Sequence, residues 1–124
     1  MIACDASTLI AYIQGENGAD VDRLDAALAD GSIALPPVVL SEILSEPKLP
    51  AEHRDIVLRL PTLEITDGYW LRAAATRSTV LANRLRAPLA DTLIAQSCID
   101  HDLALVTRDR DFRHFAAHCG LRLA

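Results

Sequence analysis

The order of the predicted elements indicates an α/β protein, a three-layer α/β/α sandwich with a central, mostly parallel sheet. Short apolar segments alternate along the chain with segments of helical patterning, which is typical of a parallel sheet covered by helices. The expected strands are apolar throughout, without polar alternation, as strands are when both faces are buried. The chain has 124 residues, of which 51% are hydrophobic, and we expect a single domain over residues 1–124.

Each element follows from local patterning. The short apolar runs predict strands at 1–5, 33–35, 63–65, 103–107 and 121–123. Helices are expected at about 7–14, 16–31, 36–45, 51–60, 68–84, 88–100 and 111–118. Pro36, Pro37 and Pro88 suit first helical turns, and Asp67 reads as the N-cap of the longest helix.

The charge distribution separates the chain into two halves. Residues 1–60 hold 10 acids and 4 bases, whereas residues 61–124 hold 7 acids and 8 bases, all arginine. The formal net charge of −5 is unusual for a nucleic-acid-binding protein, which normally presents a basic surface. The arginine-bearing half could still face phosphates, and the acidic half suits a basic partner.

Membrane and secreted classes are not expected. No segment approaches the roughly 20 apolar residues of a membrane span. The N-terminal MIACDASTLIAY has no basic leader and carries Asp5 inside its apolar run, unlike a secretory signal. Three widely spaced cysteines, Cys4, Cys98 and Cys119, argue against a disulfide framework and fit a reduced cytoplasm.

Two carboxylates follow expected strands. Asp5 closes the first strand and Asp109 follows the strand at 103–107. In open parallel sheets, ligands bind outside the carboxyl ends of the strands, where the strand order reverses. Either residue taken singly is more simply a cap for the next helix.

Two further carboxylates lie on helices with their apolar neighbours. Glu42 shares a helical stripe with Val38 and Val39, and Asp91 lies one turn from Ile94. A buried carboxylate is normally paired or bound to a metal. A structural ion pair is one alternative, with Arg84, Arg86 or Arg108 as the cation. For Asp91 a favourable charge in the first helical turn is another.

Together the four acids predict a cation site. Like charges gathered at one place repel and raise one another's pKa, and a divalent cation removes that conflict. Clusters of carboxylates without Cys or His select hard ions such as Mg²⁺ or Mn²⁺. In phosphoryl chemistry such ions activate water and stabilise the attacking and leaving oxygens.

The acidic blocks resemble those of the PIN-domain nucleases, and most closely the VapC-type toxins of bacterial toxin–antitoxin pairs. The matching segments are DAST at Asp5, VVLSEIL at Glu42, LADTLIAQSC at Asp91 and LVTRDRDF at 105–112. Each block is weak alone, but their order and placement are specific together, and the resemblance covers essentially the whole chain. It implies an α/β/α sandwich and a metal-dependent endoribonuclease.

The resemblance also implies residue roles. The expected catalytic residues are Asp5, Glu42, Asp91, Asp109 and Asp111, with Mg²⁺ or Mn²⁺ on Asp5, Asp91 and Asp109. The fourth acidic position can be Asp109 or Asp111, because the loop is about a residue shorter than in many members. Ser7 and Thr107 match hydroxyl positions that hold water or acids. Arg84, Arg86, Arg108 and Arg110 could meet phosphate or, equally, pair with neighbouring acids.

The implied partners are an RNA substrate, a small antitoxin protein with a basic C-terminal segment, and a second copy of the chain. Trp70, Leu71 and Leu81 are expected in the core or at this homodimer contact. The alternatives are a non-catalytic binding module of the same fold, or a nuclease for RNA processing or DNA. A DxDxT phosphatase is excluded because position 7 is Ser, and a phosphoacceptor receiver because the only Lys is Lys48. His114 and His118 have a zinc-like spacing, but an exposed helix explains them better.

Overall fold

The first strand is the centre of the sheet in the computed structural model, which describes residues 1–124. The order is β2-β1-β3, and both pairings are parallel. In chain order the elements are β1 (Ile2–Cys4), α1 (Ala6–Ile13), α2 (Ala19–Asp30), β2 (Ile33–Ala34), α3 (Pro37–Leu44), α4 (Ala51–Leu58), α5 (Tyr69–Ala82), α6 (Leu89–Asp100), β3 (Ala104–Val106) and α7 (Phe112–Cys119).

The register of the strands places the ends of β1 and β3 side by side. Cys4 is the partner of Val106, so the next residues, Asp5 and Thr107, leave the sheet together. The chain goes from β1 to β2 on one side and later returns to pair β3 on the other side. The point where the order reverses therefore lies between β1 and β3, the position where open parallel sheets bind ligands.

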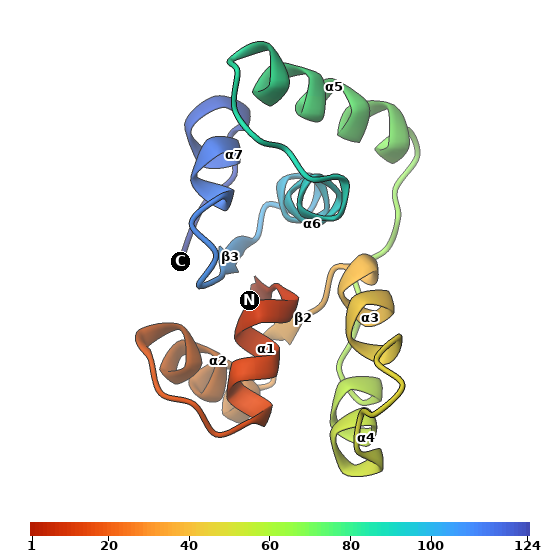
Figure 1. Ribbon diagram of the computed structural model, residues 1–124, viewed down its shortest axis with the longest axis vertical. Coiled ribbons are helices and arrows are strands. Elements are labelled where there is room, and N and C mark those ends of the chain that lie inside the picture. The colour runs from red at the N-terminus through yellow and green to blue at the C-terminus, as the bar shows by residue number, and fades with distance from the viewer.

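Helices cover both faces of the sheet and confirm the predicted three layers. Figure 1 shows α5, α6 and α7 on one side of the strands and α1 and α2 on the other, with α3 and α4 extending the second group. Helix α6 packs on β3, while α2 packs on β2 and β3. Because both faces are covered, the strands carry apolar side chains throughout.

The core joins the sheet to both helical layers. Its largest fully buried side chains include Leu24 from α2, Leu105 from β3, and Phe112 and Phe115 from α7. The two phenylalanine rings pack at a tilt, with centroids 6.1 Å apart. Since Phe112 directly follows the charged loop after β3, its burial fixes where that loop ends.

Proline and glycine set several helix ends. Pro36, Pro50 and Pro88 are the N-caps of α3, α4 and α6. Gly31 ends α2 at φ 65°, a left-handed conformation that glycine adopts without a Cβ clash. The predicted helix over LADTLIAQSCID agrees with α6 at both ends.

Two predicted strands are reduced to single bridges. In place of a strand at 63–65, one parallel bridge joins Thr62 to Leu35, and in place of 121–123 one bridge joins Leu123 to Leu105. Both segments lie at the outer edges of the sheet, where only one neighbouring strand is present to supply hydrogen bonds. The edges thus extend the parallel order without forming regular strands.

The start of α5 also differs from the prediction. Gly68, not Asp67, is its N-cap, at φ 81°, and no side chain caps the helix. The guanidinium of Arg72 instead donates to the Asp67 carbonyl at 2.7 Å and to the Asp100 carboxylate of α6. Trp70 was expected either in the core or at a contact with a second copy, and its 64% exposure excludes the core.

None of the helices combines the length and the apolar composition needed to cross a membrane.

We expect Phe115→Ala to lower the free energy of unfolding by about 3–5 kcal/mol, because it removes a fully buried ring and leaves a cavity. Leu58→Ala is the matched control, since Leu58 is 54% exposed and its truncation should change stability by less than about 0.5 kcal/mol. Urea denaturation of both variants measures the difference, and equal losses would contradict the packing of α7.

Candidate functional site

Asp5 and Thr107 form the centre of a polar cluster at the carboxyl ends of β1 and β3. The Thr107 hydroxyl donates to Oδ2 of Asp5 at 2.6 Å, joining residues 102 positions apart in sequence. Asp5 is only 4% exposed. The parallel register of the two strands thus brings the first predicted acid and the predicted hydroxyl residue into direct contact.

The helix that follows β1 orients the Asp5 carboxylate further. Asp5 is the N-cap of α1 and accepts the Thr8 backbone N–H at 3.1 Å. The Ser7 hydroxyl lies 2.9 and 2.8 Å from its two oxygens. Burial raises the pKa of Asp5, the Thr107, Thr8 and Ser7 hydrogen bonds oppose that rise, and the charge of Asp109 adds to it. Asp5 is therefore both a helix cap and an oriented member of the carboxylate cluster.

The charged loop Thr107–Asp111 is held by its own side chains. The Asp109 backbone N–H donates to the Thr107 hydroxyl oxygen at 3.0 Å, and Oδ1 of Asp109 accepts the Asp111 backbone N–H at 2.9 Å. These bonds connect the loop to Asp5 through Thr107. They give Thr107, Asp109 and Asp111 of the TRDRD segment each a hydrogen-bonding role within the loop. Oδ2 of Asp109 makes no hydrogen bond with the protein.

Asp91 lies in the first turn of α6, and the charges of all the other predicted acids raise its pKa. Partial burial raises its pKa to about 6, and the charges of Asp109, Glu42, Asp5 and Asp111 add to the rise in that order. No hydrogen bond contributes to this shift. The fold thus gathers carboxylates from β1, α3, α6 and the loop after β3 around one half-buried aspartate.

The position of Glu42 corrects one expectation. It was expected on the core-facing side of its helix, but it is exposed at the rim of the cluster. Partial desolvation still raises its pKa, with the charge of Asp5 as the second cause. The backbone of α3 turns Val39 and Ile43 into the core, which leaves Glu42 facing outward between them.

The structure distinguishes Asp109 from Asp111. Of the neighbouring acids, Asp109 raises the pKa of Asp91 the most, and it also raises the pKa of Asp5. Asp111 has the smallest of the four effects on Asp91, and Arg86 lies 3.8 Å from its carboxylate. Asp109 is therefore the more central of the two candidates for the fourth acidic position.

The central carboxylates have no cationic partner within the protein. No ion pair involves Asp5, Glu42, Asp91 or Asp109, and the ion pairs present are Arg72–Asp100, Arg86–Asp111, Arg108–Glu16, Arg108–Asp20 and Arg122–Asp102. The structural ion pair that could have explained Asp91 is thus not formed. Repulsion among these acids remains uncompensated by any side chain.

The oxygen donors of the cluster fit a hard divalent cation, although the carboxylates do not surround a single point closely. No three His, Cys, Asp or Glu side chains lie close enough together to hold a metal ion directly. Mg²⁺ commonly keeps several of its waters and uses only one or two carboxylates, so a partly open cluster of this kind suits it. The candidate ligands are Asp5, Asp91 and Asp109, all oxygen donors, of which one or two would bind the ion directly and the rest through its waters.

Arg108 pairs with neighbouring acids, which is one of the two roles that the sequence allowed; the other was contact with phosphate. Its guanidinium binds both oxygens of Asp20, at 2.8 and 3.1 Å, and lies 3.8 Å from Glu16. Asp20 also accepts the Thr8 hydroxyl at 3.0 Å, and these bonds lower its pKa to about 2, with Arg108 as the main cause. The network fastens the loop after β3 to the α1–α2 pair.

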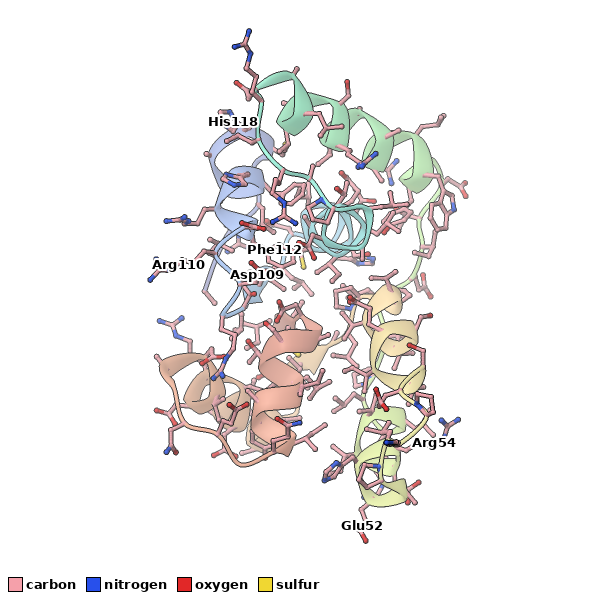
Figure 2. The ribbon with its side chains drawn as sticks, viewed as in Figure 1. Glu52, Arg54, Asp109, Arg110, Phe112 and His118 are labelled. Carbon is pink, nitrogen blue, oxygen red and sulfur yellow. The ribbon has the colours of Figure 1, made fainter.

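Sequence reasoning missed Asp20, because an acid in the first turn of a helix normally needs no further explanation. Of the other arginines, Arg84 and Arg110 are exposed and form no ion pair, while Arg86 lies near Asp111. Figure 2 shows the Arg110 side chain pointing outward beside the loop that carries Asp109. The structure therefore joins Asp5, Ser7, Thr107 and Asp109 by hydrogen bonds, and the charges of Glu42 and Asp111 also act on Asp91. Arg86 and Arg110 lie beside this cluster, whereas Arg84 forms no hydrogen bond or ion pair with it.

Other reactive side chains form no second site. Cys4, Cys98 and Cys119 are free, as expected. Burial raises the pKa of the Cys98 thiol to about 12, and raises that of Cys4 as well, so both remain protonated. His114 and His118 lie on α7 and belong to no group of metal ligands.

The fold and site together define an α/β/α protein with a parallel sheet and a carboxylate cluster at the reversal of strand order, and the comparison with known families is more specific. The PIN domain model matches residues 2–118. The chain therefore belongs to the PIN domain family, as its acidic blocks predicted.

Two solved structures have the same fold. One is VapBC2 from Rickettsia felis, crystallised with a DNA fragment from its promoter, with a TM-score of 0.78, 22% identity and coverage of 100% of this chain and 98% of the other. The other is FitAcB from Neisseria gonorrhoeae, with a TM-score of 0.70, 18% identity and coverage of 99% and 96%.

The raised pKa of Asp91 predicts a pH-dependent loss of stability without metal. Between pH 3.8 and about 6 the folded state keeps a proton that the unfolded state has lost, so the free energy of unfolding falls as pH rises through this window. We expect Asp91→Asn to be more stable than the parent at pH 7.5 in EDTA by about 1 kcal/mol, after allowing for solvent screening of a half-exposed group.

Urea denaturation at pH 4 and pH 7.5 measures this difference. Asp55→Asn, at an exposed acid on α4, is the control and should change little at either pH. A destabilised Asp91→Asn at pH 7.5 would show that Asp91 is a favourable structural charge instead.

Binding of a cation should reverse the sign of the Asp91 effect. A ligand that binds only the folded state stabilises it by about 2.7 kcal/mol at 100 times its dissociation constant. Mn²⁺ or Mg²⁺ should therefore raise the melting temperature of the parent and of Asp55→Asn, but not that of Asp91→Asn. Thermal denaturation at constant ionic strength tests this, and equal shifts in all three would place the ion elsewhere.

Proposed function

We propose that the chain is a Mg²⁺- or Mn²⁺-dependent endoribonuclease and the toxin component of a toxin–antitoxin pair. The observation that carries the proposal is the cluster of carboxylates around Asp91. Partial burial, together with the charges of these acids, raises the pKa of Asp91 to about 6. Membership of the PIN family supports nuclease chemistry, and the VapC-like acidic blocks support the more specific class.

Each side chain of the cluster has a distinct role in this proposal. Asp5, Asp91 and Asp109 would hold the cation, while Ser7 and Thr107 keep the Asp5 carboxylate in one orientation. When bound, the cation would lower the pKa of a water molecule and balance the negative charge that develops at phosphorus. Glu42 is exposed at the rim, where it can orient the attacking water, and Asp111 adds a more distant negative charge.

The proposed partners follow from the exposed surfaces and the family resemblance. The acidic first half of the chain suits a small antitoxin with a basic C-terminal segment. Trp70, Leu71 and Leu81 are 64%, 80% and 46% exposed along α5, which favours a contact with a second copy of the chain. The proposal includes both contacts.

The direct test is cleavage of a mixed single-stranded and structured RNA pool by purified protein in Mg²⁺ or Mn²⁺. We expect EDTA to abolish cleavage and Asp91→Asn to slow it by about 100-fold or more, since the loss of a few kcal/mol at the transition state costs tenfold per 1.36 kcal/mol. Asp55→Asn should retain full activity.

The alternatives make different predictions in the same assay. Cleavage of single-stranded DNA in preference to RNA would favour a DNA nuclease. A folded parent that cuts neither nucleic acid would favour a binding module. Cutting that persists in Asp91→Asn would contradict the proposed site. A neighbouring small reading frame with a basic C-terminus would support the toxin assignment.

A further inference from the structure

An arginine-lined pocket lies next to the carboxylate cluster at the same edge of the sheet. It has a volume of about 200 Å³ and is formed where β3, the following loop and the start of α7 meet. Arg108, Arg110 and Arg113 line it, and Asp109 and Thr107 form part of its wall. A ligand group in this pocket would therefore lie directly beside the residues proposed to hold the cation.

Only two of the three guanidinium groups are available to a ligand. Arg108 is bound to both oxygens of Asp20. Arg110 and Arg113 are exposed and form no ion pair. Nε of Arg113 donates to the Arg110 carbonyl at 3.0 Å, which restricts its guanidinium while leaving the other N–H groups free. The pocket thus presents two unneutralised, partly oriented positive groups.

The opposite side of the cluster has the opposite character. Glu42 lines a separate pocket of about 460 Å³ between α1 and the α3–α4 segment, together with Glu46, Lys48 and His53. Neutral Ile10, Gln14 and Leu49 complete much of that wall. Lys48 offsets only one of its two carboxylates, so this pocket has a small negative formal charge, whereas the β3–α7 pocket has three arginines and one aspartate. The electrostatic field therefore favours the approach of phosphate from the arginine side.

We propose that Arg110 and Arg113 bind a backbone phosphate of single-stranded RNA adjacent to the phosphate that is cleaved. This inference rests on the proposed function and adds the path of the substrate to it. Arginine forms charge-assisted, planar hydrogen bonds that match phosphate geometry. Contacts to phosphate fix the register of the strand without reading its bases, so this pocket positions RNA and does not select its sequence.

Arg113 was not singled out from the sequence. It lies three residues after Arg110, a spacing that places side chains close together in a helical turn, and this spacing was the available clue. An unpaired arginine alone carries little information, because Arg54 and Arg59 on α4 are also exposed and unpaired. The pocket beside Asp109 is what distinguishes Arg110 and Arg113. Figure 2 shows Arg110 at the left edge of the molecule and Arg54 at the lower right, so the two arginines lie on different sides of it.

The test measures binding of a fluorescein-labelled single-stranded RNA by anisotropy, in EDTA and in the Asp91→Asn background. Adding Arg110→Gln and Arg113→Gln should weaken binding by about tenfold or more, because two charged contacts to phosphate are lost. The slope of log K against log salt should fall in magnitude by about 0.7, the value for one neutralised phosphate on a single strand.

The matched control removes the same charge from α4, with Arg54→Gln and Arg59→Gln, and should leave affinity near that of the parent. The double variant Arg110→Lys with Arg113→Lys keeps both positive charges, so its salt dependence of RNA binding should be close to that of the parent. If the arginines only held the loop in place, the lysine variant would not restore this salt dependence. Equal binding by the two glutamine pairs would overturn the pocket assignment and leave the nuclease proposal standing. Unchanged RNA binding with lost binding of an acidic peptide would assign the pocket to a protein partner. A parent that binds no RNA would overturn both.

Discussion

The hydrogen bond from Thr107 to Asp5 is the interaction on which the site depends. It joins the carboxyl ends of β1 and β3 at the reversal of strand order, with 2.6 Å between the Thr107 hydroxyl oxygen and Oδ2 of Asp5. The same hydroxyl accepts the backbone N–H of Asp109, so one threonine connects Asp5 to Asp109. Without this link the position of the loop after β3 beside α1 would depend on the contacts of Arg108 with Asp20, Glu16 and the Asn17 carbonyl.

The carboxylate cluster places like charges together at a cost to the stability of the fold. Asp91 is half-buried among like charges, and no arginine or lysine neutralises the central acids. Elsewhere the fold pairs its charges well, as Arg72 does with Asp100 between α5 and α6 at 2.7 Å. This contrast between paired surface charges and unpaired crowded carboxylates is the structural basis of the proposed cation site.

The sequence predicted the layers and the acids, because both follow from local patterns. Apolar runs define buried strands, and Pro88 with the following helical pattern defines α6 at both ends. The prediction of regular strands at 63–65 and 121–123 was wrong, because strand pairing at the sheet edges depends on neighbouring segments that the sequence does not specify. The outward position of Glu42 and the Asp20–Arg108 pair also depend on tertiary packing, which no spacing rule contains.

The most direct test of the account is a crystal structure of the protein grown with Mn²⁺, using anomalous scattering to locate the ion. The account predicts a peak beside Asp91 that also contacts Asp5 and Asp109 directly or through water, with Asp111 farther away. A fully occupied peak at His114 and His118, or a well-ordered cluster that stays empty at high Mn²⁺ concentration, would contradict it.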